Sequence, residues 1–239
     1  MARGEAFSVY FNLFSRISAV EVRDGRLGLR PGPGTIALLV VMIGTVAFDG
    51  ASEGQPWTDI APDIQDFFTS IGFSLGTALE LTFTVGMLIG LGLVAAVYLL
   101  GIAGVRTVDQ RPFGGVARSF IHTLVPIAAV YVIAHYFSLL AYNGQAIAYL
   151  ASDPLGEGSD IFGTADSTID YGVIGATAIW YVQVGVLVAG HVCGLVLAHD
   201  RALALYRGAR AATTSQYWML AVMVAFTTGG LFLLSQANQ

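Results

Sequence analysis

The residues of this sequence that are best suited to chemistry are its four histidines, which lie on two long apolar runs. They are His122 and His135 in the run Ser119–Tyr142, and His191 and His199 in the run Ile174–His199. An apolar run of about 20 residues is long enough to cross a lipid bilayer as a helix. Because an ionisable side chain is costly inside a membrane, such a residue is a candidate functional group wherever it occurs there.

Three of these histidines, His122, His191 and His199, are predicted to lie toward the same end of two neighbouring helices. A rise of about 1.5 Å per helical residue places His122 and His199 at similar depth, with His191 one or two turns deeper. Neutral imidazole is the commonest protein ligand of transition metals, so the three predict a transition-metal site or a single haem. Two haems are disfavoured, because only the inner pair of histidines matches in depth. The alternative is that the three are structural, hydrogen-bonded histidines or members of a proton path.

The fourth histidine belongs to a polar stripe on the run Ser119–Tyr142. Tyr131, His135, Ser138 and Tyr142 follow i, i+4, i+7, i+11 spacing and therefore share one helix face. Such a face should contact protein or water and not lipid. We therefore predict an outward-facing binding vestibule lined by this stripe, with the acidic segment 143–172 as its lid.

One acidic residue, Glu80, is also a candidate binding residue, because it lies in another apolar run, Ile71–Gly104, two turns in from its outer end. The alternative for Glu80 is an interfacial carboxylate that reaches water. The sequence contains no nucleophile elbow, paired-histidine zinc helix, phosphate loop or dinucleotide fingerprint. The sequence has no basic patch with interleaved aromatic residues, so nothing in it suggests a nucleic-acid partner.

The composition indicates that lipid is the solvent around the elements that carry these residues. Of the 239 residues 55% are hydrophobic and only 11% are charged, whereas a soluble domain carries about 25% charged residues. All eleven basic residues are arginines, in clusters at 3–30, 106–118 and 201–210. The acidic segments 49–72 and 143–172 contain no arginine and lie between these clusters.

Basic residues mark cytoplasmic connections, so this alternation predicts the topology. We expect an all-α, polytopic transmembrane helix bundle of about five spans, with the N-terminus cytoplasmic and the C-terminus outside. Residues 1–34 would form a cytoplasmic amphipathic lead, 35–239 the bundle, and 49–72 and 143–172 its external segments. The predicted spans are Thr35–Phe48, Ile71–Gly104, Ser119–Tyr142, Ile174–His199 and Thr213–Ser235. An acidic amphipathic helix over Trp57–Phe73 and a short helix over Gln145–Ala151 would lie outside the bilayer.

Several stretches carry a resemblance to a known group of proteins: RGEAFSVYFNLFSRIS, VAFDGASEG, HYFSLL, ASDPLG, FGTAD, IWYVQV, GHVCGLVLAHDRA and SQYWMLAVM. In these the chain resembles the C-terminal half of actinobacterial multi-pass membrane proteins that carry the label "fenitrothion hydrolase". Those proteins are longer and have further spans upstream, so the resemblance implies a short form or a fragment. The label implies hydrolysis of organophosphate esters by a metal centre that activates water. Only His122, His191 and His199, or His135 with acids of the loop, would supply such a centre.

Three functions follow from these features. The first is a permease-like or accessory subunit of the bacterial inner membrane that handles a small ligand, proton, metal or haem through buried histidines. The second is the metal-dependent hydrolase. The third is a structural subunit, for which the small-residue pairs Gly86/Gly90 and Gly190/Gly194 would be docking seams. The expected partners are the lipid bilayer and either other membrane subunits or further copies of the chain.

Overall fold

The computed structural model describes residues 22–23, 26–27, 34–108, 112–206 and 208–237. This part of the chain is helical except for a two-stranded antiparallel pair, β1 (Val22–Arg23) with β2 (Arg26–Leu27). The long helices are α2 (Thr35–Ala51), α3 (Gln55–Ser70), α4 (Leu75–Val105), α6 (Leu124–Asn143), α8 (Ala176–Leu205) and α9 (Ala209–Ala237). Shorter pieces are α5 (Phe113–Phe120), α7 (Ile147–Ser152) and the 3₁₀ turns Ile121–Thr123 and Gly144–Ala146. The predicted amphipathic lead, residues 1–34, lies almost entirely outside the described residues.

Helices of membrane-crossing length account for most of the predicted spans. Leu75–Val105, Phe113–Ser152 and Ala176–Leu205 are each long and apolar enough to cross a bilayer. A fourth crossing is possible if α2 and α3, which meet at a bend of 91°, are taken as one broken span. The protein is therefore an all-helical chain with three to four candidate membrane spans. The segment predicted as the last span is helical too, as α9.

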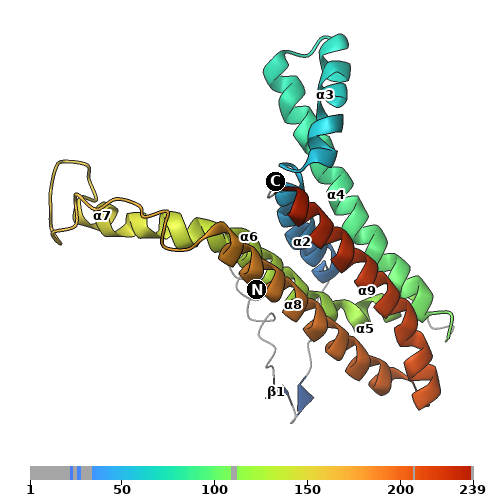
Figure 1. Ribbon diagram of the computed structural model, residues 1–239. Coiled ribbons are helices and arrows are strands. Elements are labelled where there is room, and N and C mark those ends of the chain that lie inside the picture. Colours follow the sequence, from blue (N-terminus) through green and yellow to red (C-terminus); the bar gives the residue numbers. More distant parts are fainter. Residues whose placement is uncertain (1–21, 24–25, 28–33, 109–111, 207, 238–239) are drawn as a thin grey trace, which may run out of the picture.

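The bend between α2 and α3 follows from the local sequence. Gly54 has an extended backbone and precedes α3, and Pro56 occupies the first turn of that helix, where its missing N–H costs nothing. The acidic helix predicted over Trp57–Phe73 is confirmed as α3, although it begins at Gln55 and ends at Ser70. Helices α3 and α4 form a hairpin that projects from one end of the bundle (Figure 1).

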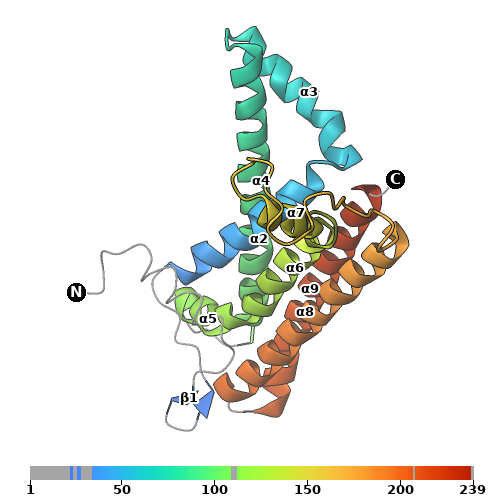
Figure 2. The same ribbon diagram turned by 90° about the vertical axis from the view of Figure 1, so that its left-hand side faces the viewer.

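The bundle is built from antiparallel neighbours: α6 packs against α8, α2 against α4, and α9 against both α8 and α4 (Figures 1 and 2). Its most deeply buried side chains include Phe120 of α5, Ile102 and Val105 of α4 and Ala202 of α8. The core is therefore densest at the end of the bundle where α5 crosses beneath α4 and α8.

Glycines set the closest of these helix contacts. A Cβ added at Gly190 would lie 2.2 Å from Cγ2 of Val130, and one at Gly194 would lie 3.0 Å from the carbonyl oxygen of Thr123. At Gly86 an added Cβ would lie 2.3 Å from Cη2 of Trp57. Both small-residue pairs are thus filled by helices of the same chain. This corrects the idea that Gly86/Gly90 and Gly190/Gly194 are seams for another subunit.

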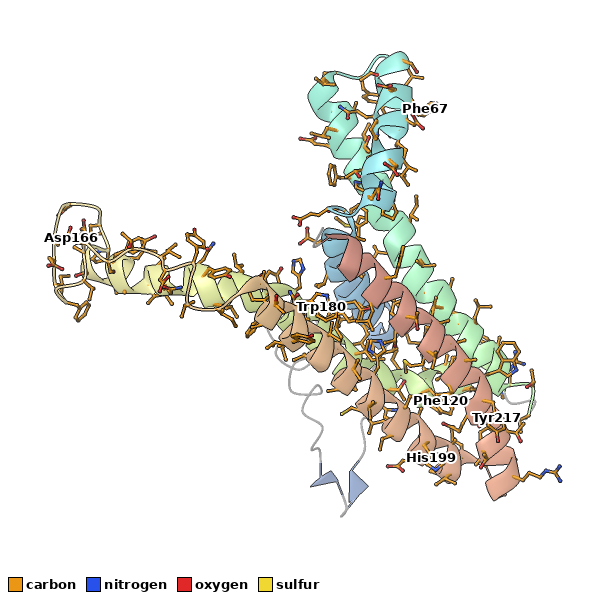
Figure 3. All side chains as sticks on the ribbon, in the orientation of Figure 1. Phe67, Phe120, Asp166, Trp180, His199 and Tyr217 are labelled. Carbon is orange, nitrogen blue, oxygen red and sulfur yellow. The ribbon has the colours of Figure 1, made fainter. Side chains whose placement is uncertain are left out.

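The segment after α6 continues away from the bundle. The 3₁₀ turn Gly144–Ala146 and helix α7 prolong α6 into an arm, and the loop of residues 153–175 folds back from its tip (Figure 1). Figure 3 shows Asp166 at this tip, whereas His199 lies near the opposite end of α8. The predicted short helix over Gln145–Ala151 is confirmed as the turn and α7 together.

Candidate ligand-binding cavity

A cavity of about 780 Å³ lies among α2, α3, α4, α6, α8 and α9. Its lining is overwhelmingly apolar, with side chains such as Val94 of α4, Leu187 of α8 and Phe226 of α9. Drug-sized ligands occupy sites of ~300–1,000 Å³ that combine an apolar wall with a few well-placed polar groups. The cavity therefore has the size and character of a small-molecule site.

Aromatic rings form its wall where α2 bends into α3. The rings of Phe48 and Trp57 meet edge to face, with 5.0 Å between their centroids, and Phe83 lies 5.8 Å from Trp57. Gly86 and Gly90 of α4 line the cavity beside these rings. Because Gly86 has no side chain, both rings lie directly on the backbone of α4.

A carboxylate–imidazole pair stands at the edge of this apolar space. Nε2 of His135 on α6 lies 2.7 Å from Oδ2 of Asp49 at the end of α2. The His135 side chain is 27% exposed and that of Asp49 is 68% exposed. His135 lines the cavity, as does Gly50, whose added Cβ would lie 3.9 Å from Nδ1 of His135. The imidazole thus has one nitrogen on the carboxylate and the other toward Gly50.

Two further polar side chains line the cavity. Nε2 of Gln183 on α8 donates a hydrogen bond to the carbonyl oxygen of Ala134, at 3.0 Å. The hydroxyl of Tyr131 lies beside Gly230 of α9, 3.2 Å from the position of an added Cβ. Within the described part of the chain this hydroxyl has no hydrogen-bond partner. Few polar groups converge on a large apolar volume, which is the usual pattern of a ligand site.

His191 lies one layer behind the cavity and is only 4% exposed. Its Nδ1 lies 2.7 Å from the carbonyl oxygen of Leu187, and its ring forms a cluster with those of Tyr131 and Phe226, at 6.2 and 6.4 Å between centroids. Its Nε2 is buried and has no hydrogen-bond partner among the described residues. An unsatisfied buried nitrogen costs free energy, so this position is unusual for a purely structural histidine.

The other predicted metal ligands do not join His191. His122 lies in the 3₁₀ turn before α6, beside the backbone of Ser119 and Leu197 and near Arg201. His199 is exposed near the end of α8 (Figure 3). Among the described residues, no group of three or more His, Cys, Asp or Glu side chains is arranged to hold a metal ion. The metal or haem site at His122, His191 and His199 therefore stays a prediction, because the fold does not bring these three side chains together as ligands.

Only half of the polar stripe that was predicted to line the vestibule lies in the cavity. Tyr131 and His135 line the cavity, whereas Ser138 and Tyr142 are not among its lining residues. The Tyr142 hydroxyl donates to the carbonyl oxygen of Ile174, at 2.7 Å, and its ring lies 5.3 Å from that of Tyr171. Tyr142 therefore anchors the returning loop to the arm. Glu80 is exposed on α4 and is also absent from the lining.

The acidic loop is organised by its own side chains and backbone. Oγ of Ser152 donates to Oδ1 of Asp160, at 2.6 Å, and the Ala165 N–H donates to the same oxygen. Oδ1 and Oδ2 of Asp153 accept the N–H groups of Glu157 and Gly158. These hydrogen bonds hold the pKa of both carboxyls below its usual value, chiefly through Gly158 for Asp153 and through Ser152 for Asp160. The carboxylates thus serve as turn-forming acceptors.

This loop does not form the predicted lid over the vestibule. None of its described residues lines the cavity, and it folds at the tip of the arm (Figure 3). The physical reason is that α6 does not stop at Tyr142. Helix continues through the turn Gly144–Ala146 and α7, so the loop is carried outward along the axis. The bend of α2 into α3 closes that side of the cavity instead.

Sequence reasoning missed several residues of the site, above all Asp49, Gln183 and the aromatic pair Phe48 and Trp57. Asp49 follows directly after an apolar run and was assigned only to an acidic external segment. Its partner is distant in the sequence, so no local spacing reveals the pair. Gln183 is a usable signal, since it is a lone amide inside a long apolar run.

Comparisons of the chain with protein-family models, with curated proteins and with solved structures gave no match.

Proposed function

We propose that this chain is a polytopic membrane protein that binds a small, largely apolar ligand in the cavity among α2, α3, α4, α6, α8 and α9. The observation that carries the proposal is a cavity of about 780 Å³ with an Asp49–His135 pair at its edge. Three of the helices that line it, α4, α6 and α8, belong to segments that are long and apolar enough to cross a bilayer. An apolar ligand would reach such a site directly from the lipid, in which it is already dissolved.

The proposal includes the topology that the arginines indicate: five crossings, a cytoplasmic N-terminus and an outer C-terminus, in a bacterial inner membrane. The support for it is the alternation of arginine clusters with acidic segments along the chain. In this arrangement the protein is a permease-like or accessory subunit that works with other membrane subunits or with further copies of itself.

Catalysis is not part of the proposal. The resemblance to proteins that carry a hydrolase label would place water activation at a metal held by histidines. Among the described residues, no group of three or more His, Cys, Asp or Glu side chains is arranged to hold such a metal.

Ligand entry is measurable through the fluorescence of Trp57, which lines the cavity. A variant with Trp180→Phe and Trp218→Phe leaves Trp57 as the sole reporter. In lipid nanodiscs, we expect 1-bromododecane to quench this fluorescence saturably, at one site per chain. Gly229→Phe should abolish the saturable quenching, because Gly229 lines the cavity and has open space where a side chain would extend.

Gly92→Phe is the matched control, since Gly92 also faces open space but does not line the cavity. Quenching that rises linearly with 1-bromododecane, and equally in both variants, would refute the binding site.

The topology is tested separately in a Cys193→Ser background, because Cys193 is the only cysteine of the sequence. On intact cells an impermeant maleimide should label Ser167→Cys and spare Gly114→Cys, and the reverse would refute the orientation.

A further inference from the structure

We infer that the ligand of this cavity is a neutral apolar molecule with a hydroxyl group, and that this hydroxyl hydrogen-bonds to Nδ1 of His135. The inference rests on the proposed function, which assigns ligand binding to the cavity. It adds the chemical class of the ligand and the atom that recognises it.

Asp49 fixes the orientation of the His135 imidazole. Nε2 of His135 lies 2.7 Å from a carboxylate oxygen of Asp49, so Nε2 must carry a proton and donate it in that hydrogen bond. Asp49 is not a lining residue, whereas His135 is. Asp49 thus stands behind the ring and fixes its tautomer, in the way a carboxylate orients a functional histidine.

The other ring nitrogen of His135, Nδ1, has no partner among the described residues. Nδ1 lies toward Gly50, a lining residue without a side chain to cover it. No described residue donates to it or accepts from it. His191 provides the contrast, since there the same atom, Nδ1, is taken up by the carbonyl oxygen of Leu187. On His135 the corresponding nitrogen is left for a molecule in the cavity.

The chemistry of Nδ1 selects the polar group of the ligand. Neutral imidazole offers an acceptor at Nδ1, and the imidazolium form offers a donor there. A hydroxyl both donates and accepts, so it satisfies Nδ1 in either form. An ether or ketone only accepts and has no partner on the neutral ring. An anionic ligand would bring its charge close to the carboxylate of Asp49, which repels it.

Gln183 and Tyr131 are further polar side chains that line the cavity. Gln183 uses its amide N–H on the carbonyl oxygen of Ala134, which leaves its amide oxygen as a second acceptor. The Tyr131 hydroxyl supplies a donor and an acceptor. Both residues line the cavity with His135. The rest of the wall is apolar, which fits a molecule with one hydroxyl and a hydrocarbon body.

The test compares two probes that differ only at the hydroxyl: 11-bromoundecan-1-ol and its methyl ether. Both quench Trp57 in the single-tryptophan protein in nanodiscs. We expect the alcohol to bind about tenfold more tightly, as for one additional hydrogen bond. Binding of both probes should be lost in Gly229→Phe.

Two near-isosteric variants then assign the preference to one nitrogen. His135→Asn keeps an acceptor near the position of Nδ1 and should retain the preference for the alcohol. His135→Gln places its amide near the position of Nε2, keeps the contact with Asp49, and should lose the preference. Asp59→Asn, which changes an exposed acid on α3 away from the cavity, should behave as the parent protein. Size-exclusion and circular dichroism confirm the fold of each variant.

The outcomes separate this inference from the proposed function. Equal affinities for alcohol and ether, both lost in Gly229→Phe, would overturn the hydroxyl assignment and leave ligand binding intact. The same preference in His135→Gln as in His135→Asn would overturn the role of Nδ1. If neither probe quenches saturably, the proposed function itself fails.

Discussion

The ring of Phe48 on α2 meets the ring of Trp57 on α3 edge to face, with 5.0 Å between centroids and an interplanar angle of 87°. Both rings pack against the backbone of α4 at Gly86, which has no side chain. This contact ties the bend between α2 and α3 to α4 and shapes the aromatic wall of the cavity.

Gly86→Ala is therefore expected to destabilise the protein by about 1–3 kcal/mol, as for an overpacked core. The new methyl group would lie 2.3 Å from Trp57 and 2.5 Å from Phe48, so both rings must move. Gly92→Ala on the same helix meets nothing within 4 Å and should leave stability unchanged or slightly raised. Unfolding in a denaturing-detergent titration measures both. Equal stability of the two variants would contradict the packing at Gly86.

Gly190→Ala tests the seam between α6 and α8 in the same way. Its methyl group would lie 2.2 Å from Cγ2 of Val130, which predicts a loss of about 1–3 kcal/mol. Val130→Ala removes the two nearest atoms, Cγ2 and Cγ1, and leaves only Cβ at 2.9 Å, so the double variant should recover part of that loss. A double-mutant cycle by thermal denaturation measures this coupling. Purely additive effects would show that the two helices do not meet at these residues.

His191→Leu is expected to leave stability unchanged or to raise it. The buried Nε2 has no partner among the described residues, and an apolar replacement removes that unsatisfied group. The carbonyl oxygen of Leu187 loses its contact with the imidazole but still accepts a backbone hydrogen bond within α8. Denaturation in detergent, with metal analysis of the purified protein, checks this. A marked loss of stability together with loss of bound transition metal would instead support the metal prediction.

The loop at the tip of the arm should lose order on acidification. The pKa of Asp160 is lowered from its usual 3.8 by the hydrogen bonds from Ser152 and Ala165. The stabilisation is therefore present above pH 3.8 and disappears as the pH falls through the lower pKa of the folded state. The amide resonances of Gly158 and Ala165 should be constant from pH 8 to 5 and shift at lower pH.

Two variants identify the source of that loop transition. Asp160→Ala should disorder the residues around Ala165 even at neutral pH, since it removes the oxygen that accepts both hydrogen bonds. Asp166→Asn should leave the loop unchanged, because Asp166 is exposed and has no hydrogen bond among the described residues. Similar behaviour of the two variants would refute the organising role of Asp160.

The helices were largely predictable because each is a long apolar run bounded by charged or turn-forming residues. Their interruptions were less visible. The run Ser119–Tyr142 is broken by a 3₁₀ turn at Ile121–Thr123, and α6 begins anew at Leu124. Pro126 lies in the first turn of α6, where proline is tolerated. Sequence periodicity does not distinguish this restart from an unbroken helix.

The candidate site was predictable only along one helix. Tyr131 and His135 share a face, and both line the cavity. The same face continues to Tyr142, where it meets the returning loop, because the helix is longer than the bundle around it. The pairing of His135 with Asp49 depends on how α2 packs against α6, and such packing carries no local signature in either segment.

The stretch Phe113–Ser152 has one remaining consequence. Its 40 residues amount to a rod of about 60 Å, roughly twice the hydrocarbon thickness of a bilayer. Where such a rod crosses the lipid upright, about half of its length lies outside the hydrocarbon. The loop that follows its far end carries the exposed side chains of Leu155 and Phe162 and contributes no residue to the lining of the ligand cavity.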